Sequence, residues 1–224
     1  MSQFDAVLQQ RDPADRADRA NPAHATDADQ AAHADHADHA AQADHAAHAE
    51  ALATLRTAIE SIVDPEMNGV TIGQLGMVLD VRMGSAGDVE VDFSPTFLGC
   101  VAVGLIALDI ENTVLRGVAA NESRPAPLIS ECRVKVVHNI WNPDRISKSG
   151  VEQLRTLGIV VVRSDQRLEK VGCPVCAGPG LERRGGSGPT RCRTVAWCTG
   201  CRNVVEVMES PPSDRATSGT YAHI

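Results

Sequence analysis

The stretch "LGMVLDVRMGSAGDVEVDFSPTFLGC", residues 75–100, decides the fold of the middle of the chain. Residues 75–83 and 88–93 have the composition of two β-strands, and the glycine-containing segment "GSAG" between them is typical of a tight turn. A Ser-Pro-Thr segment follows the second strand, and Cys100 stands directly before a long apolar run. The stretch therefore predicts a strand hairpin that leads through a turn into a helix.

Further helices and strands flank this hairpin. On its N-terminal side, aliphatic residues at helical spacing form one stripe over residues 52–62, and Asp64 ends that helix because a residue before proline avoids the α-helical region. On its C-terminal side, residues 98–116 predict a helix that is apolar nearly all round and therefore buried. "ECRVKVVHN" alternates like a third strand, and "SKSGVEQLRTLGIVVV" predicts a short helix and a final strand. The order α-β-β-α-β-α-β predicts a small α/β domain over residues 50–166.

The N-terminal tract has a different composition. From Ala14 to His48 the chain repeats near-triplets of alanine, aspartate and histidine, without any Val, Ile, Leu or aromatic residue that could build a core. Histidines three residues apart would spiral around a helix instead of lining one face. The tract could store zinc or nickel, but a solvated tract without a function explains it more simply. We predict disordered tails over residues 1–49 and 210–224.

Charge and apolar composition exclude two classes of partner. Residues 1–50 hold three arginines and ten acidic residues, so this tract carries −7 of the net charge of −8. The rest of the chain is nearly neutral and offers no basic face to nucleic acid. Its apolar runs are too short to cross a bilayer, and no segment near the N-terminus has the pattern of a signal peptide. We therefore expect a cytoplasmic protein that binds neither nucleic acid nor membrane.

Five of the seven cysteines fall within residues 171–210, a segment with few large apolar residues. Four of them form two C-x2-C pairs with the spacing of zinc knuckles: Cys173, Cys176, Cys198 and Cys201. Because so small a segment cannot be stabilised by its own core, we predict a structural zinc in a ribbon module over residues 170–209. The fifth cysteine, Cys192, could replace one ligand, stay a spare thiol, or help to hold an iron–sulfur site in place of zinc.

Three segments of the middle region resemble a known family. "IESIVDPEMNGVTIGQLGMVLDV", "VDFSPTFLGCVAV" and "IWNPDRISKSGVEQLRTLGI" are similar to the small iron–sulfur assembly domain of SufT-like bacterial proteins and their eukaryotic cytosolic counterparts. The added cysteine-rich segment, with "GSGPTRCRTVAWCTGC", narrows the resemblance to PaaD-like proteins, which are components of phenylacetyl-CoA epoxidase systems. The likeness covers residues 52–208, in two modules that follow each other in the same order.

The resemblance assigns functional positions to individual residues. Six residues of this chain occupy positions of the family's motif: Asp64, Pro65, Glu66, Thr96, Cys100 and Trp141. It implies a cofactor site formed by Asp64, Glu66 and Thr96, at which Cys100 is a transient ligand of iron or an iron–sulfur cluster. From the residues alone, capping of a turn explains the two carboxylates equally well, and Cys100 could simply pack in a core.

Cys100 is the residue that we expect to carry the chemistry. Ser94 or Thr96 could cap the helix predicted to start beside it, and Gly99 allows a tight turn. A cysteine in a first helical turn faces unpaired backbone N–H groups and the positive end of the helix dipole, and both lower a thiol pKa. One thiolate cannot enclose a cluster, so further ligands would come from a second subunit, the client or a small thiol.

These features favour a metallocluster assembly or accessory factor. We expect the α/β domain to handle iron or an iron–sulfur unit and the ribbon to dock oxygenase subunits or other iron–sulfur client proteins, with a homodimer left open. Two alternatives stay open: a non-catalytic or electron-transfer subunit of a phenylacetyl-CoA epoxidase-like oxygenase, and a zinc-ribbon adaptor without cofactor chemistry. The sequence contains neither a nucleotide-binding glycine motif nor a nucleophile–base constellation, so we do not expect independent enzyme activity.

Overall fold

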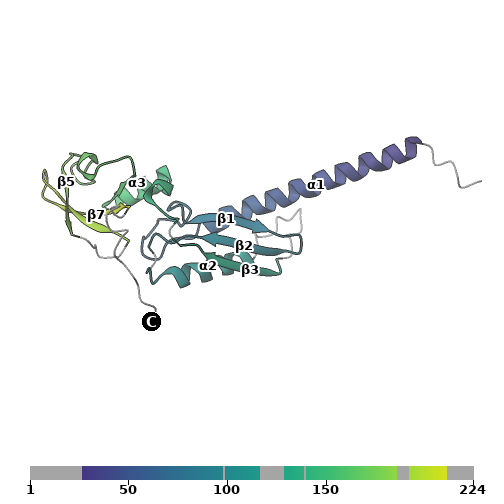
Figure 1. Cartoon of the computed structure of the whole chain (residues 1–224), viewed down its shortest axis with the longest axis horizontal. Coiled ribbons are helices and arrows are strands. Elements are labelled where there is room, and N and C mark those ends of the chain that lie inside the picture. Colours follow the sequence, from purple (N-terminus) through teal and green to yellow (C-terminus); the bar gives the residue numbers. More distant parts are fainter. Residues whose placement is uncertain (1–26, 98, 117–128, 139, 186–191, 211–224) are drawn as a thin grey trace, which may run out of the picture. The chain divides into compact units, whose positions relative to one another are not determined.

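The computed structural model describes residues 27–97, 99–116, 129–138, 140–185 and 192–210. It divides into two units, residues 1–47 and residues 48–224, which are described separately (Figure 1). Of the tails predicted over residues 1–49 and 210–224, residues 1–26 and 211–224 lie outside the described residues. In the part of the chain that the structure describes, no helix has the length and apolar character needed to span a membrane.

Helix α1 (Asp27–Glu60) starts in the first unit and ends in the second. It begins well before Glu50, where the sequence predicts order to start. Alanine is the strongest helix former, and no proline interrupts residues 27–60, so the backbone continues as a helix through the alanine-rich repeats. Leu55 and Ile59, in the last turns of α1, are buried in the core of the second unit.

The second unit contains a three-stranded sheet in the order β1-β2-β3, where β1 is Val78–Met83, β2 is Asp88–Phe93 and β3 is Glu131–Val136. β1 and β2 form the predicted antiparallel hairpin, and β2 and β3 are parallel. A parallel pair needs a crossover connection, which helix α2 (Val103–Leu115) provides here (Figure 1). The strand, strand, helix, strand order predicted from residues 75–139 is therefore confirmed.

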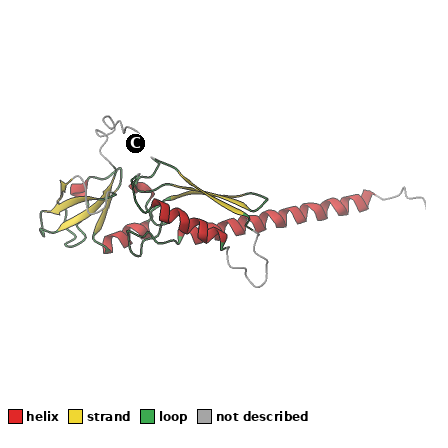
Figure 2. Cartoon of the chain, turned by 90° about the horizontal axis from the view of Figure 1, so that it is seen from below, coloured by secondary structure: helices red, strands yellow, loops and turns green. Residues whose placement is uncertain are grey.

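Helix α2 is buried on one face only, contrary to the prediction of a helix buried all round. Ile106, Ile110 and Val114 are fully buried and face the core, whereas Leu105 and Leu108 on the other side are about half exposed. The helix contacts β3 alongside the sheet, and one layer of sheet can cover only one side of a helix (Figure 2). An apolar composition on both sides therefore leaves an uncovered face.

The remaining elements form a second sheet and its connections: η1 (Pro143–Arg145), α3 (Lys148–Thr156), β4 (Ile159–Val162), η2 (Leu168–Lys170), β5 (Leu181–Gly185), β6 (Thr194–Cys198) and β7 (Val204–Glu209). The strand order is β4-β7-β6-β5. β4 is parallel to β7, and the other neighbours are antiparallel. Strand β4 belongs to the predicted α/β domain, whereas β5, β6 and β7 belong to the predicted ribbon. One sheet therefore extends across the predicted boundary near residue 168.

Strands β4 and β7 contribute to two hydrophobic cores. Alternate side chains of a strand point to opposite faces of a sheet. One face packs into the core of the α/β domain through Ile159, Val161 and Met208. The other face packs into the core of the ribbon through Val160, Val162, Val205 and Val207. The β4–β7 pair is thus a wall shared by both modules, which explains why all four residues of β4 are buried.

Candidate metal sites

Four cysteine side chains converge in the ribbon. Their sulfur atoms lie within 4.8 Å of one another, and they belong to the two predicted pairs: Cys173, Cys176, Cys198 and Cys201. Across the pairs, the Sγ atoms of Cys173 and Cys201 and those of Cys176 and Cys198 are each 3.7 Å apart. Four sulfurs at tetrahedral positions, each about 2.3 Å from a zinc ion, are separated by about 3.8 Å. The cluster therefore has the dimensions of a four-thiolate metal site.

Two similar backbone turns bring these sulfurs together. In the first, the backbone N–H of Ala177 donates to the carbonyl of Cys173; in the second, that of Arg202 donates to the carbonyl of Cys198. Ala177 and Arg202 follow the last cysteine of each pair and have φ values of 60° and 65°. The left-handed conformation costs a non-glycine residue about 1–2 kcal/mol. Both turns contain one residue in this unfavourable conformation, and both direct their thiols to one point.

One thiol of this cluster is prepared for metal binding by a neighbouring amide. Asn203 Nδ2 lies 3.5 Å from Cys201 Sγ and donates toward it. This contact is the main reason why the pKa of Cys201 is lowered to about 6. Metals bind the thiolate form of cysteine, so this contact favours Cys201 as a ligand.

Cys192 does not join this cluster. It packs against the core of the α/β domain instead of the core of the ribbon. The five-residue strand β6 separates it from Cys198, and at about 3.3 Å per residue such a strand spans roughly 16 Å. Strand geometry therefore argues against the prediction that Cys192 is a ligand of the ribbon metal, and Cys192 is not in the group of four converging sulfurs.

A second candidate site lies where strand β2 leads toward helix α2. The Sγ atom of Cys100 lies 3.6 Å from Oε2 of Glu66. The backbone N–H of Glu66 donates a 2.8 Å hydrogen bond to Oδ1 of the buried Asp64. A sulfur and an oxygen bound to the same tetrahedral ion lie about 3.5 Å apart. The structure thus brings together three of the residues singled out in the sequence, and the dimensions suit a shared metal ion.

The electrostatics of this site reverse the expected direction for Cys100. Burial, followed by the charges of Glu66 and Asp64, raises the pKa of the Cys100 thiol, although the backbone N–H of Ala102 acts in the opposite sense. Helix α2 begins only at Val103, so Cys100 lies outside its first turn. Burial likewise raises the pKa of Asp64. A bound cation would favour the ionised forms of Cys100 and Asp64, so the site is suited to a positive ion.

The predicted cap of helix α2 is absent from its described N-terminus. The N-cap residue is Ala102, which makes no side-chain capping bond. Thr96 is half-buried in the loop between β2 and Cys100, and none of the hydrogen bonds described for the chain joins it to Cys100 or Glu66. Ser94 is buried, and among the described residues its hydroxyl has no hydrogen-bond partner.

Two further residues make long-range contacts: Trp141 and Arg193. Trp141, at a motif position, donates from Nε1 to the carbonyl of Leu75 over 2.7 Å and ties the loop after β3 to the start of the hairpin. Arg193 was not found from the sequence. It is buried, pairs with Glu206 in the ribbon, and its charge acts on Asp64. Arg193 follows Cys192 in the sequence, and nothing in this local pattern indicates an interaction with Asp64, which lies far away in the chain.

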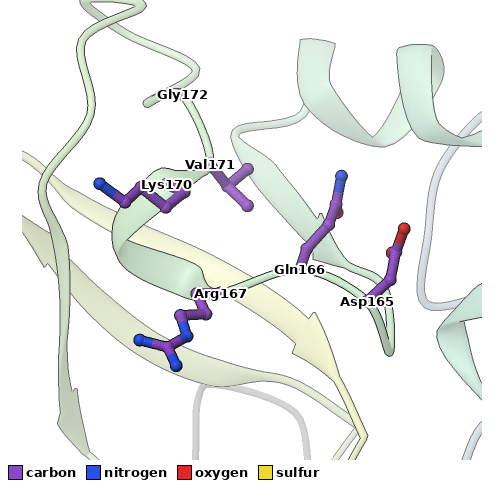
Figure 3. A pocket seen from close by; sticks show the side chains of 6 residues that line it. All are labelled: Asp165, Gln166, Arg167, Lys170, Val171 and Gly172. Atoms are coloured by element: carbon purple, nitrogen blue, oxygen red, sulfur yellow. The ribbon is translucent and has the colours of Figure 1, made fainter.

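The ribbon also borders a surface hollow of about 540 Å³. It is lined by six residues around η2: Asp165, Gln166, Arg167, Lys170, Val171 and Gly172 (Figure 3). None of its lining residues belongs to either candidate metal site, and both signs of charge are present. The metal-site residues therefore do not lie in this hollow.

Comparisons with known proteins match two successive parts of the chain. Residues 52–124 match the family described as iron–sulfur cluster assembly protein, and residues 160–209 match the PaaD zinc beta ribbon domain. The chain is also 26% identical over 148 residues to an Escherichia coli (strain K12) protein assigned as one of the subunits of 1,2-phenylacetyl-CoA epoxidase. That match covers 64% of this chain and 84% of the relative.

Two solved structures are related to part of the chain. A domain of unknown function, DUF59, from Bacillus anthracis is 28% identical, with a TM-score of 0.42, over 48% of this chain and 94% of that one. A Mycobacterium tuberculosis protein associated with Fe–S complex assembly and repair is 32% identical, with a TM-score of 0.27, over 49% of this chain and 87% of that one.

Proposed function

From a chain that carries an iron–sulfur cluster assembly domain followed by a PaaD zinc ribbon domain, we propose an accessory factor that hands iron or an iron–sulfur unit to a multicomponent oxygenase. The observation that carries the proposal is the 3.6 Å contact between Cys100 Sγ and Glu66 Oε2. The similarity to an epoxidase component supports an oxygenase as the client.

The chemistry of the Cys100 site suits a transient cargo. Cys100 and Glu66 would bind the iron, and the Cys100 thiol would lose its proton as the metal binds. Because the pKa of the Cys100 thiol is raised, a proton competes with the metal for the sulfur. The sulfur therefore takes up a proton again when the cargo leaves. Asp64 holds the backbone of Glu66 and so positions the carboxylate beside the sulfur.

In the ribbon, we propose a resident zinc bound by the four converging cysteines. The ion would cross-link the two C-x2-C turns and stabilise a module whose buried core is small. The ribbon then offers a folded surface to the client. Four thiolates also suit a single redox iron, as in the electron-transfer alternative, and such an iron would give a visible absorption that zinc does not.

Metal analysis of anaerobically purified full-length protein tests this assignment. We expect one zinc per chain, no visible chromophore at the ribbon, and loss of that zinc in Cys198→Ser. A stable chromophore that disappears in Cys198→Ser would replace the zinc assignment by the electron-transfer alternative.

The delivery function is tested by comparing Cys100→Ser with Cys132→Ser. Both thiols are partly buried, and both have a raised pKa, so Cys132 is a matched control on β3. We expect the iron content and activity of the co-expressed client oxygenase to fall in Cys100→Ser and to stay at the parent level in Cys132→Ser, while both proteins remain folded. Full loading by Cys100→Ser would show that Cys100 only packs in the core.

A further inference from the structure

Cys176 is the exposed cysteine of this chain. The structure describes all seven cysteines, and the other six are buried or partly buried. Within the ribbon cluster, Cys173 and Cys198 are fully buried and Cys201 is partly buried. Oxidation of cysteines is selective for those that a reagent can reach from solvent. Of the four converging thiols, that of Cys176 is therefore the most open to attack.

Two glycines border the sulfur of Cys176. A Cβ atom on Gly178 would lie 3.5 Å from Cys176 Sγ, and a Cβ atom on Gly200 would lie 3.8 Å from the Sγ atoms of both Cys176 and Cys198. Neither glycine has a positive φ, so the backbone conformation does not require glycine at these two positions. The absence of both side chains leaves the approach to the Cys176 sulfur open.

The sulfur of Cys198 lies 3.7 Å from that of Cys176. The two residues belong to different C-x2-C pairs and are 22 positions apart in the chain. A disulfide between them would therefore join the two turns of the ribbon to each other. The other two sulfurs of the cluster, those of Cys173 and Cys201, are also 3.7 Å apart and belong to different pairs.

We propose that Cys176 is an oxidative modification site, at which hydrogen peroxide converts the metal cluster into a disulfide between Cys176 and Cys198. The inference rests on the resident zinc proposed above for the ribbon. The Cys176 thiolate first attacks one peroxide oxygen, which forms a sulfenic acid and releases hydroxide. The Cys198 thiolate then attacks the Cys176 sulfur, which forms the S–S bond and releases a second hydroxide. The two thiolates lose two electrons in total, and the peroxide gains them.

The disulfide would replace the metal as the cross-link of the ribbon. Two ligands are lost in the reaction, and the two thiolates that remain cannot complete a tetrahedral site, so the zinc leaves. The new covalent bond keeps the two turns together in a module whose core is small. A reductant cleaves the bond and regenerates both ligands. The ribbon thus responds to peroxide reversibly.

Peroxide treatment of the anaerobically purified full-length protein tests the proposal. Zinc release is followed with a chromophoric chelator, and disulfides are mapped by mass spectrometry after the free thiols have been alkylated. We expect an equimolar amount of hydrogen peroxide to form the Cys176–Cys198 disulfide and to release the zinc, while Cys100 and Cys132 stay reduced. A phosphine reductant and added zinc should restore the bound metal.

Alanine substitutions test the route of attack without removing a ligand. Gly178→Ala and Gly200→Ala each place a methyl group in ordinary van der Waals contact with the Cys176 sulfur, so both variants should bind zinc like the parent. Peroxide should release that zinc roughly threefold more slowly, or slower still, because the sulfur is covered. Gly104→Ala in α2 is the matched control, since no atom lies within 4 Å of its added methyl group, and it should release zinc at the parent rate.

The possible outcomes separate this inference from the proposed function. The inference is overturned if a cysteine outside the cluster is oxidised before Cys176, or if the first disulfide joins Cys173 to Cys176. It is also overturned if zinc leaves while Cys176 is still reduced, or if both glycine variants bind zinc and lose it at the parent rate. If the glycine variants do not bind zinc, the disulfide map of the parent protein decides. If the purified parent ribbon holds no zinc, the zinc assignment fails, and the same map still shows whether Cys176 is the modified residue.

Discussion

Replacing Met208 with alanine should destabilise the α/β domain, although Met208 belongs to the last strand of the ribbon. Its side chain is fully buried and lies in the core formed with residues of α1, α2 and the first sheet. Truncation of a buried methionine to alanine costs about 2–5 kcal/mol, because transfer free energy is lost and a cavity is left. We expect a loss of about 3 kcal/mol in the free energy of unfolding, equivalent to a fall in Tm of roughly 6–12 °C for a unit of this size.

The two tryptophans of the chain make the effect measurable in each module. Trp141 lies in the α/β domain and Trp197 lies on β6 of the ribbon. In a Trp197→Phe background, the fluorescence of Trp141 follows the α/β domain during denaturant unfolding. Met208→Ala should move the midpoint of this transition to a lower denaturant concentration, and the free energy of unfolding obtained from it should fall by about 3 kcal/mol.

The matched control is Val204→Ala on the same strand. Val204 is 61% exposed, so its truncation should cost less than about 1 kcal/mol. If Met208→Ala leaves the Trp141 transition within about 0.5 kcal/mol of the parent, β7 does not contribute to the core of the α/β domain. The β4–β7 pair would then not be a wall shared by both modules.

Three further predictions concern the metal sites. Burial raises the pKa of Asp64 above 3.8 in the folded state, so the contribution of this group to stability is present at low pH and is lost as pH rises through the folded-state pKa. Asp64→Asn should therefore be more stable than the parent protein at pH 7, measured by urea unfolding across pH. An equal or lower stability would contradict the assignment. Glu66→Gln removes a carboxylate that raises the pKa of Cys100, so Cys100 of the metal-free variant should react faster with iodoacetamide at about pH 7.5, measured by mass spectrometry. An unchanged rate would show that the carboxylate does not act on the thiol. Cys192→Ser should retain the full metal content of the ribbon, measured by elemental analysis, since β6 keeps Cys192 away from the cluster; loss of the metal would restore it as a ligand.

The four-cysteine site could be predicted from the sequence because its geometry is local. Each C-x2-C pair places two sulfurs through a single turn, and Pro174 and Gly200 already indicate tight turns. The hairpin before Cys100 is equally visible, since strand and turn composition alternate there. The position of Glu66 beside Cys100 came only from the resemblance, because the two lie 34 positions apart in the chain and no spacing rule connects them.

The features that could not be predicted depend on contacts between distant segments. An apolar sequence on all sides of α2 cannot distinguish a buried helix from one with an exposed side. The run of four apolar residues in β4 has no alternation, so it does not show which strand lies beside it. The direction of the Cys100 pKa depends on where α2 starts and on which carboxylates lie near the sulfur, and both are set by the folded structure.

The β4–β7 pair has a consequence for any attempt to divide this protein. The match to the PaaD zinc beta ribbon domain begins at residue 160, inside β4, and not in the connection that follows it. A cut after β4 would leave β7 without its parallel neighbour and expose Val205 and Val207. A cut before β4 would remove Ile159, Val161 and Met208 from the α/β domain. Each half of this chain therefore loses part of its core when the other half is removed, so an exchange with a relative's module would have to include both β4 and β7.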